Sequence, residues 1–382
     1  MAMFQLNSTS MPPETEIIRA KVRTFLDKER AEGRFKSHTS SWSTFDPEFS
    51  RRAAAEGFVG MTWPKRYGGG EHSNLERFVV TEEMLAAGAP SGAHWIADRQ
   101  SGPQILKHGS ERAKREILPR IAAGECFFGI GMSEPESGSD LAAVRTRAAK
   151  VDGGWVINGS KIWTSNAHRV HYLIVLARSE APGGNRHSGL TQYIVDTASP
   201  GVEIRPILNL AGAHEFNEVF FCDCFVPDDM LVGQPGEGWA RVTGELAFER
   251  AGPDRFMSDI RLVAELVDKV GSTPSERQAI EIGRCVAHFA ALRRMSSSIA
   301  VLLEQGENPV TEAALLKDAG TSFEREIPEL VRRLIEVEPS LDDDDRLTEA
   351  TAHVLLHAPS FTLRGGTPEI LRGLIARGLG LR

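Results

Sequence analysis

The chain has 382 residues, of which 41% are hydrophobic and 25% charged, and its formal net charge is −8. This length allows two or three domains with buried cores, and the composition excludes a disordered or fibrous protein. The acidic balance and the lack of a basic stripe argue against nucleic-acid binding. The N-terminus has no secretion-signal pattern and no run approaches a membrane span, so we expect a cytoplasmic protein.

The four cysteines show neither a disulfide framework nor the spacing of a zinc ribbon. Cys222 and Cys224 are expected on one face of a strand, where packing explains them better than metal binding. We therefore predict reduced cysteines and no metal site.

The first third of the chain has the pattern of helices. Over residues 14–34, Ile18, Val22 and Leu26 recur at helical spacing among charged residues. Further helices are predicted over 48–57, 74–87, 101–108 and 110–123. A helical N-terminal domain is therefore expected over residues 1–125.

From Cys126 the pattern changes to short alternating apolar runs separated by turn residues. Strands are predicted over 155–157, 172–177, 191–195, 202–204 and 218–221. The segment 181–188, rich in Gly, Pro and polar residues, fits an exposed hairpin loop. These runs predict a β domain over residues 126–236.

Helical patterns return after Trp239 and continue to the C-terminus. Residues 278–303 carry an apolar stripe of the kind found in bundle cores. More helices are predicted over 311–319, near Pro328 and over 347–357, and the acidic run 342–345 is interpreted as a solvated loop. The last helix has Thr367 as N-cap, Pro368 at its first position and Gly378 near its end. A helical bundle is expected over residues 237–382.

The first candidate binding motif lies where an apolar run ends. Residues 127–132 are short and apolar enough for a buried strand. Residues 133–140 then read Ser-Glu-Pro-Glu-Ser-Gly-Ser-Asp, whose hydroxyls and backbone N–H groups are free to meet a polar ligand. A strand that leads into such a loop can cradle that ligand.

The second candidate motif follows a predicted hairpin. Asn158-Gly159 lies between two apolar runs and predicts a tight turn, followed by a strand over 161–166. Trp163 and Ser165 would share one face of that strand and Thr164 the other. An aromatic face beside a hydroxyl suits a flat heteroaromatic ring, although a buried core Trp and a surface Ser loop explain either motif alone more simply.

Together these motifs resemble the acyl-CoA dehydrogenase family, and the resemblance continues through residues 219–240 and ends in Gly-Gly-Thr-Pro-Glu-Ile-Leu-Arg at 365–372. It implies an α+β fold with a helical N-terminal domain, a central β-barrel domain and a C-terminal four-helix bundle. It also implies an FAD flavoenzyme that converts an acyl-CoA thioester into the trans-2-enoyl-CoA. The α proton would be abstracted by a base, and the β hydrogen would pass to FAD as hydride.

The resemblance also implies residue roles. Flavin-binding positions are Ile130, Met132, Ser133, Gly138, Ser139, Trp163, Thr164, Ser165, Gly366, Thr367 and Glu369. Ser139 and Arg250 would contact the CoA moiety, with a structural ion pair as the alternative for Arg250. No metal ligand is implied.

The position of the base is where this chain departs from many relatives. They carry a Glu just before Gly-Thr in the C-terminal motif, whereas this chain has Gly365. A minority place the base in a Glu-Arg pair on the helix after Gly-x-Gly-Trp, which matches Glu249 followed by Arg250. Glu249 is therefore the predicted base, and a salt bridge to Arg250 or Arg255 is the alternative. The N–H of Gly365 keeps the expected role of hydrogen-bond donor to the thioester oxygen.

A second departure concerns the cofactor and the assembly. The Arg-x-x-Phe-Gly segment with which most relatives grip the FAD adenosine and pyrophosphate across subunits is missing from 265–290. Arg293 and Arg294 could substitute, or they could be ordinary solvent-facing arginines. We expect a homodimer or homotetramer that passes electrons to an electron-transfer flavoprotein. The alternatives are an oxygen-using oxidase or monooxygenase on the same fold, and a non-catalytic or co-catalytic subunit of a heteromer.

Overall fold

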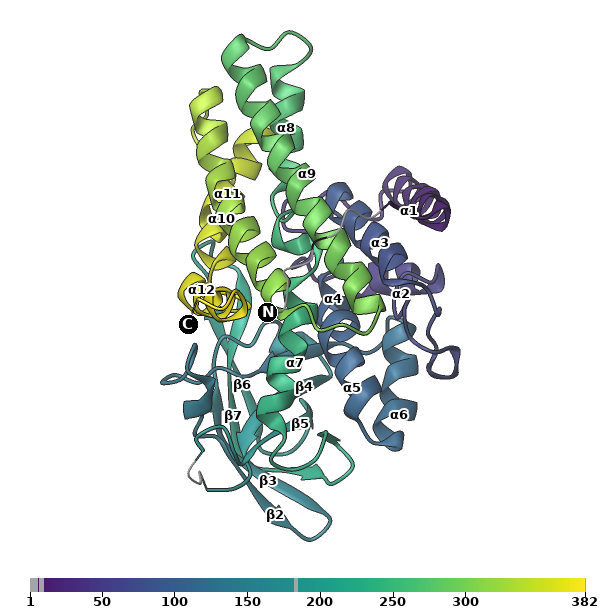
Figure 1. Ribbon diagram of the computed structural model, residues 1–382, viewed down its shortest axis with the longest axis vertical. Coiled ribbons are helices and arrows are strands. Elements are labelled where there is room, and N and C mark those ends of the chain that lie inside the picture. Colours follow the sequence, from purple (N-terminus) through teal and green to yellow (C-terminus); the bar gives the residue numbers. More distant parts are fainter. Residues whose placement is uncertain (1–5, 7–9, 182–184, 382) are drawn as a thin grey trace. The chain divides into compact units, whose positions relative to one another are not determined.

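The computed structural model describes residue 6 and residues 10–181 and 185–381, with the side chains of 246–248 left undescribed. Two compact units are formed from alternating parts of the chain. Unit 1 contains Met1–Phe45, His72–Gly92 and Ala247–Arg382, and unit 2 contains Asp46–Glu71 and Ala93–Leu246. The domain boundaries predicted at 125/126 and 236/237 are divisions along the sequence and stay a prediction. Figure 1 labels the α-helices and most of the strands.

Unit 1 is helical throughout its described part. Its helices are α1 (Pro13–Ala31), α3 (Asn74–Ala87), α8 (Ile260–Val270), α9 (Glu276–Glu304), α10 (Val310–Leu334), α11 (Arg346–Phe361) and α12 (Pro368–Gly378), with a 3-10 turn, η5 (Pro253–Arg255). Ser275 begins α9 with a reciprocal capping box to Gln278. Two predicted helices, 311–319 and the one near Pro328, are one continuous helix, α10.

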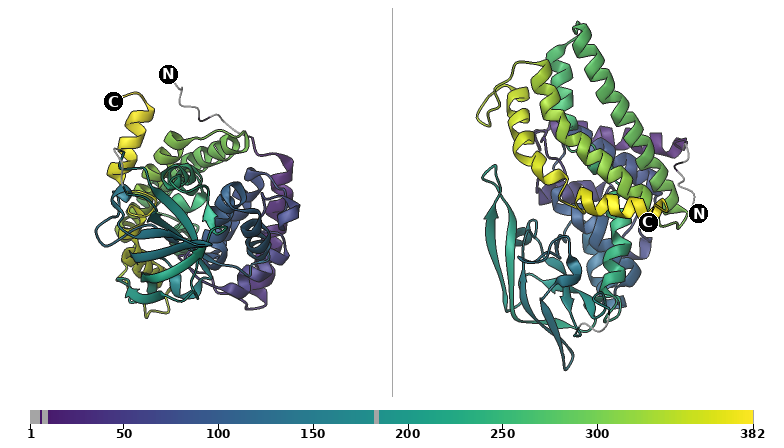
Figure 2. Two further views of the ribbon diagram at one scale, coloured as in Figure 1. Left: turned by 90° about the horizontal axis from the view of Figure 1, so that it is seen from below. Right: turned by 60° about the vertical axis from the view of Figure 1, so that its left-hand side comes forward.

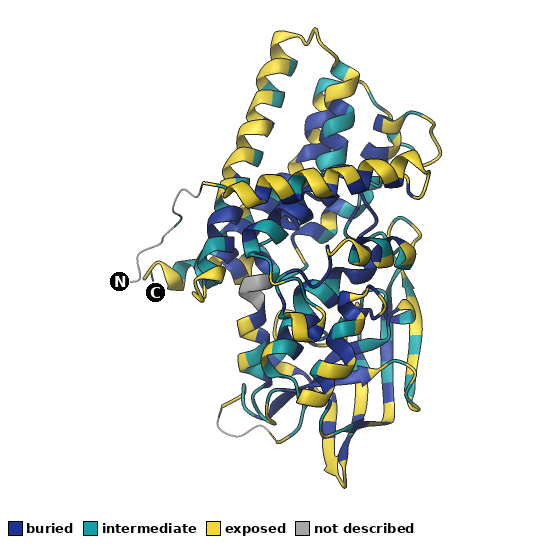
Figure 3. Ribbon diagram, turned by 90° about the vertical axis from the view of Figure 1, so that its right-hand side faces the viewer, coloured by how far each residue is buried: buried dark blue, intermediate teal, exposed yellow. Residues whose placement is uncertain are grey.

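The core of unit 1 is organised around α10, which packs against α8, α9, α11 and α12, while α3 packs against α1 and α9. Buried Leu316, Ile327 and Val331 line the inner face of α10. In Figure 3 the first turns of α9 are coloured mostly as exposed and its later turns as buried. The packing of α8, α9 and α11 against α10 forms the predicted helical bundle.

Helix α9 also bears on the expectation that no run approaches a membrane span. It is long and apolar enough to cross a bilayer by length and composition, with 33% of its most apolar window buried in the described structure. That expectation is therefore wrong for this helix. One such helix is a weak sign of membrane insertion, because bundle-core helices have the same length and composition.

Unit 2 combines helices with one sheet. Its helices are α2 (Pro47–Ala55), α4 (Gly92–Ile96), α5 (Gly102–His108), α6 (Glu111–Ala122) and most of α7 (Gly238–Arg250), with short turns η1 (Lys65–Tyr67), η2 (Ala97–Ser101), η3 (Leu141–Ala143) and η4 (Ala167–Arg169). Ser110 caps α6 by accepting a hydrogen bond from the N–H of Ala113. The Gly-x-Gly-Trp motif leads directly into α7.

The sheet contains every described strand. The strands are β1 (Phe128–Gly131), β2 (Arg147–Val151), β3 (Gly154–Lys161), β4 (Tyr172–Arg178), β5 (Leu190–Asp196), β6 (Val202–Leu208), β7 (His214–Pro227) and β8 (Leu231–Val232). Their order is β6-β7-β3-β2-β4-β5-β8, with β1 added in parallel to β4. Figure 2 shows these strands in teal, side by side in both views. The Ile174, Val175 and Leu176 side chains of β4 are buried, as expected for a central strand.

Two local predictions in the sheet are wrong. The tight turn falls at Gly153 (φ 72°), between β2 and β3, and not at Asn158-Gly159, where β3 continues through a bulge in its pairing with β7. A bulge and a tight turn both favour glycine, so the sequence signal is ambiguous. Strand β3 then ends at Lys161, so 161–166 is not a strand.

The second correction concerns the cysteines in β7. Cys222 is exposed and Cys224 is buried, so the two thiols do not share a face. Asp223, between them, has a left-handed backbone (φ 51°) that interrupts the alternation of side chains along the strand. All four cysteines are free, as predicted. The predicted loop 181–188 falls partly on residues outside the described ranges.

Candidate active site

In unit 1, Glu249 lies in the last turn of α7 with 16% of its side chain exposed. Arg255 of η5 donates from Nη2 to Glu249 Oε1 at 3.0 Å and from Nε to the Glu249 backbone oxygen at 3.0 Å. The guanidinium therefore fixes both the side chain and the backbone of Glu249. The ion pair considered as the alternative for Glu249 is formed, but the carboxylate is largely buried rather than at the surface.

Gly365 lies directly against this carboxylate. A Cβ atom built on Gly365 would be 3.0 Å from Glu249 Oε1, and the backbone of Gly365 is left-handed (φ 68°). No larger residue can enter position 365 without displacing the carboxylate or straining the backbone. The two sequence positions considered for the base thus meet at one place within unit 1.

The turn that carries Gly365 is held by two buried cations. Arg250 Nε donates to the Gly365 oxygen at 2.8 Å. Lys317 Nζ, from α10, donates to the oxygens of Gly366 at 2.6 Å and Thr362 at 3.3 Å. No hydrogen bond joins the N–H of Gly365 to another described residue. The carbonyls of Thr362, Gly365 and Gly366 are therefore satisfied, and the N–H of Gly365 is available to an acceptor outside the chain.

The other predicted residues of the C-terminal motif surround the start of α12. Gly366 has φ 102°, and its Cβ position would lie 3.1 Å from Arg250 Nη2. Thr367 is the extended residue before α12, as predicted, although its hydroxyl makes no capping hydrogen bond to the backbone. Hydrogen bonds from the Glu369 backbone N–H and the Thr367 hydroxyl lower the pKa of Glu369. A carboxylate in the first turn also interacts favourably with the positive end of the helix dipole.

In unit 2, the loop after β1 is joined to the end of β3 by a buried ion pair. Lys161 Nζ lies 2.8 Å from Glu134 Oε1 and donates to the Met132 oxygen at 3.1 Å. Glu134 also accepts hydrogen bonds from the backbone N–H groups of Arg145 and Thr146. The Glu of the Ser-Glu-Pro loop therefore points inward and anchors the loop, whereas Ser139 is exposed and Ser133 is half-buried.

Burial shifts the pKa values of this pair. Desolvation lowers the pKa of Lys161 to about 8, although the Glu134 charge opposes the shift. Burial alone raises the pKa of Glu134, but the Lys161 charge and the donated hydrogen bonds outweigh burial and lower it. Both groups are thus charged at neutral pH, and each is the ion-pair partner of the other.

The predicted ring-binding residues of unit 2 present an aromatic face and free hydroxyls. Trp163 is 57% exposed, has φ 59°, and meets the edge of Phe216 with 6.0 Å between ring centroids. Thr164 is fully buried, and its hydroxyl has no partner among the described residues. Ser165 is half-buried, so exposure alternates from 163 to 165 although the segment is not a strand.

The loop residues complete this face. Ile130, Met132 and Ser133 are half-buried, and Gly138 and Ser139 are exposed. No described residue hydrogen-bonds the hydroxyls of Ser133, Ser139 and Ser165. An exposed tryptophan that is not covered by the chain, next to unpaired hydroxyls, fits a flat ring system with polar edges. The residues present therefore fit the isoalloxazine of FAD.

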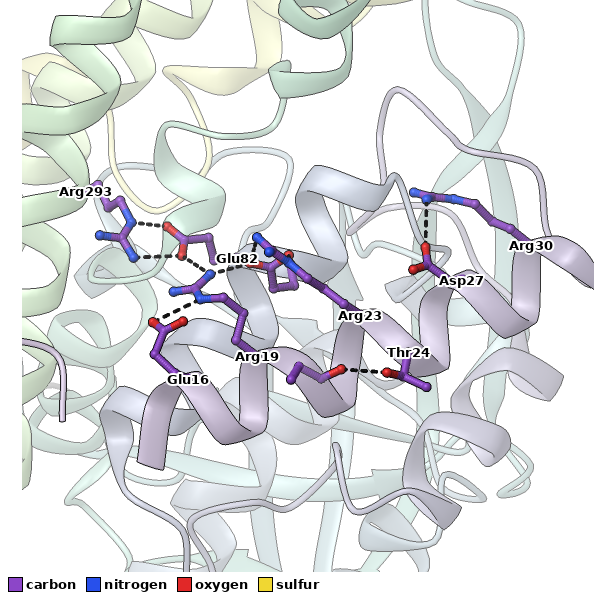
Figure 4. A network of polar contacts seen from close by, with 10 residues as sticks. Glu16, Arg19, Arg23, Thr24, Asp27, Arg30, Glu82 and Arg293 are labelled. Carbon is purple, nitrogen blue, oxygen red and sulfur yellow. Dashed lines mark hydrogen bonds and ion pairs between the residues drawn. The ribbon is translucent and has the colours of Figure 1, made fainter. Parts of the chain in front are cut away.

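Arg293, considered as a substitute for the missing pyrophosphate-binding segment, is already engaged within unit 1. It forms a two-pronged ion pair with Glu82 of α3, and Arg19 of α1 pairs with both Glu82 and Glu83 (Figure 4). Arg23 joins the same network at 2.7 Å from Glu83. The network ties α1, α3 and α9 together, and Arg293, with 39% of its side chain exposed, is a partly solvent-facing arginine engaged in an ion pair.

Among the described residues, no group of His, Cys, Asp and Glu is suited to a metal ion. Sequence reasoning missed two buried cations, Lys161 and Lys317, whereas it considered Arg255 as an ion-pair partner of Glu249. A signal for Lys317 exists in the chain, because Ala313, Leu316 and Gly320 place it within the apolar side of α10. A lysine in such a stripe is costly unless its ammonium finds acceptors.

Known proteins resemble this chain over most of its length. The family model for the acyl-CoA dehydrogenase N-terminal domain matches residues 12–125, and the model for the middle domain matches 129–224. The chain is 35% identical over 342 residues to acyl-CoA dehydrogenase IpdE1 of Mycobacterium tuberculosis, covering 87% of each protein.

Solved structures agree on the fold. The Tcur3481-Tcur3483 steroid ACAD superposes with a TM-score of 0.86 at 26% identity and covers 99% of each chain. The ChsE4-ChsE5 complex from Mycobacterium tuberculosis superposes with a TM-score of 0.84 at 27% sequence identity, and the match covers 98% of this chain and 100% of that one. The predicted fold class is confirmed, with helices at both ends of the sequence and a sheet between them.

Proposed function

The chain belongs to the acyl-CoA dehydrogenase family, and from this premise we propose that Glu249 is the base that removes the α proton of the substrate. The protein is an FAD-dependent flavoenzyme that oxidises acyl-CoA thioesters, as predicted. The observation that carries the assignment is the contact between Glu249 Oε1 and position 365, where the chain has no side chain of its own.

The reaction needs a base and a stabiliser of negative charge, and unit 1 offers both. As the α C–H bond breaks, its proton goes to a carboxylate oxygen of Glu249 and its electron pair enters the new double bond. Arg255 donates to Oε1 of the Glu249 carboxylate and so holds the proposed base in place. The thioester oxygen gains negative charge in this step, and the N–H of Gly365 is the proposed donor.

Bound FAD supplies the acceptor for the β hydrogen, which leaves as hydride. We assign the ring to the face formed by Trp163 and the hydroxyls of Ser133 and Ser165, with Ile130, Met132, Gly138, Ser139 and Thr164 around it. Gly366, Thr367 and Glu369 at the start of α12 are assigned to the cofactor as well. Ser139 and Arg250 are proposed to meet the CoA moiety. For Arg250 the contact with the Gly365 oxygen favours a role in holding the turn.

Replacement of Glu249 by Gln tests the base. The variant should keep its flavin absorbance and bind acyl-CoA, but flavin reduction under anaerobic conditions should slow by about 10²- to 10⁴-fold, the usual contribution of a general base. Glu265→Gln is the matched control, because Glu265 is also mostly buried and pairs with an arginine, Arg261, at 2.7 Å. Unchanged reduction in Glu249→Gln would rule out this base.

The assembly is proposed to be heteromeric, with a partner chain that completes the cofactor site. The missing Arg-x-x-Phe-Gly segment and the engagement of Arg293 by Glu82 both favour this arrangement over a homodimer or homotetramer. The solved relatives include a complex of two named chains, ChsE4 and ChsE5.

Flavin content tests the assembly. The chain purified alone should hold well under one FAD per chain, and co-expression with a partner that carries the missing segment should restore it. A full complement of FAD in the isolated chain would instead support the homo-oligomer. A cytoplasmic location stays a prediction.

An electron-transfer flavoprotein is the proposed electron acceptor, and a steroid-derived thioester is a candidate substrate because one solved relative is a steroid ACAD. An anaerobic panel of straight-chain, branched and steroid-derived acyl-CoA thioesters, read by bleaching of the flavin, would rank the substrates. Rapid reoxidation of the bleached enzyme by dioxygen would favour the oxidase or monooxygenase alternative instead.

A further inference from the structure

Lys317 is a fully buried lysine without a carboxylate partner. Its exposed fraction is 0%, and no acidic side chain of the described chain lies within ion-pair distance of its ammonium. Its two hydrogen-bond acceptors are backbone oxygens, of Thr362 and Gly366. Burying a charge that has only backbone acceptors costs desolvation free energy, and an apolar residue in the same space would avoid this cost.

The surroundings of Lys317 add to the cost. Desolvation, together with the nearby guanidinium groups of Arg255, Arg364 and Arg250, lowers the pKa of Lys317 to about 7, and the charge of Glu249 opposes this shift. The described chain thus gathers four cations around the turn 362–366 and the carboxylate of Glu249. A cation-rich environment disfavours the ammonium but favours any negative charge that develops close by.

The two acceptors of Lys317 bracket the residue proposed to bind the thioester oxygen. Thr362 and Gly366 are four positions apart, and the peptide N–H of Gly365 lies between them. Gly365 and Gly366 have φ values of 68° and 102°, so this backbone has no regular hydrogen-bond ladder to fix it. Arg364 holds the turn from another side, with its guanidinium 2.9 Å from Ser258 Oγ and 4.1 Å above the Trp42 ring.

We propose that Lys317 is a positioning residue of the thioester oxidation, whose ammonium spans the turn 362–366 and aims the Gly365 N–H at the thioester oxygen. A donor of this kind stabilises the transition state only when it is fixed before the reaction. A glycine-rich turn cannot fix itself, and the ammonium adds a constraint from inside α10 to those supplied by Arg250 and Arg364. This role rests on the proposed function, because it takes Gly365 as the donor.

The test uses the flavin-loaded enzyme and a chromophoric product analogue, trans-3-indoleacryloyl-CoA. Its absorption moves to longer wavelength when a hydrogen bond polarises the thioester carbonyl, and this shift does not depend on a base. Wild type and Glu249→Gln should both show the shift, whereas Lys317→Met should bind the analogue and lose most of the shift. With an oxidisable substrate, Lys317→Met should lower kcat by about 10²-fold and change KM little, as expected for a misplaced donor.

Arg332→Met, which removes an exposed cation from the same helix, is the control and should match wild type. Lys317→Gln, which keeps one neutral donor, should give an intermediate shift and provides a second variant if Lys317→Met does not fold. A full shift in either folded variant, or no shift in wild type, would overturn the role of Lys317. Loss of stability with kcat, KM and the shift unchanged would show that Lys317 serves folding alone. Turnover by Glu249→Gln would overturn the base assignment and leave this result standing.

Discussion

At the scale of single residues, Gly365 is the position where backbone conformation and active-site geometry coincide. Its left-handed φ of 68° disfavours any side chain, and a Cβ there would be in tight contact with the Glu249 carboxylate, 3.0 Å from Oε1. Both effects act in the same direction, so a substitution there should alter stability and activity together.

Gly365→Ala should lower the free energy of unfolding by about 1 to 2 kcal/mol, the cost of a left-handed backbone for a residue with a Cβ. It should also push Glu249 Oε1 away and slow flavin reduction. Gly373→Ala in α12 is the matched control, since its Cβ would meet no atom within 4 Å. That change should stabilise the helix by up to about 1 kcal/mol. Thermal unfolding of both variants would check that Gly365→Ala loses stability while Gly373→Ala gains it. Anaerobic flavin reduction would check that only Gly365→Ala is slowed.

At the scale of elements, the Lys161–Glu134 pair joins the end of β3 to the loop after β1. Of the two segments proposed to face the flavin, 130–139 contains Glu134 and 163–165 follows Lys161 along the chain. A backbone hydrogen bond from Ile162 to the Ser133 oxygen, 2.9 Å long, runs beside the ion pair. The register between the two segments is thus set by buried contacts rather than by strand pairing.

Lys161→Met should leave Glu134 buried without its cation and cost about 3 to 5 kcal/mol of stability. The double variant Lys161→Met with Glu134→Gln removes both charges and should recover part of that loss. FAD content should fall in the single variant and recover in the double one, as measured by flavin absorbance per chain. Equal stability of the single and double variants would contradict a buried ion pair.

At the scale of the whole molecule, two buried lysines make stability depend on pH. Desolvation lowers the pKa of Lys317 to about 7 and of Lys161 to about 8. Each unfolded lysine keeps its proton up to about pH 10.4, so between these values the unfolded chain binds more protons than the folded one. These two groups therefore add stability as pH rises above about 7. The buried thiols, whose pKa burial raises to about 12 for Cys126, act oppositely above about pH 8.5.

Comparison of wild type with Lys317→Met isolates one of these contributions. The free energy of unfolding of Lys317→Met, relative to that of wild type, should be higher at about pH 7 than at about pH 8.5. The reason is that the variant lacks the increase in stability with pH that Lys317 gives the wild type. Midpoints of thermal unfolding at the two pH values, with Arg332→Met measured alongside, would check the sign. A constant difference between variant and wild type would mean that Lys317 does not titrate in this range.

The sequence by itself indicated the order of helices, strands and helices, because hydrophobic periodicity is a local property of the chain. It also indicated the motifs that identify the family, and Glu249 as the candidate base. It failed at Asn158-Gly159, where a bulge and a turn have the same signature, and at the face shared by Cys222 and Cys224, which one left-handed residue reverses.

Only the tertiary structure decided which distant residues meet. Glu249 and Gly365 are separated by more than a hundred positions, and no local pattern indicates that a carboxylate oxygen of Glu249 lies only 3.0 Å from where a Cβ on Gly365 would be. The same holds for Lys317, whose acceptors are backbone oxygens in another segment. Backbone oxygens carry no sequence signature, so the partners of a buried cation are known only once the chain has folded.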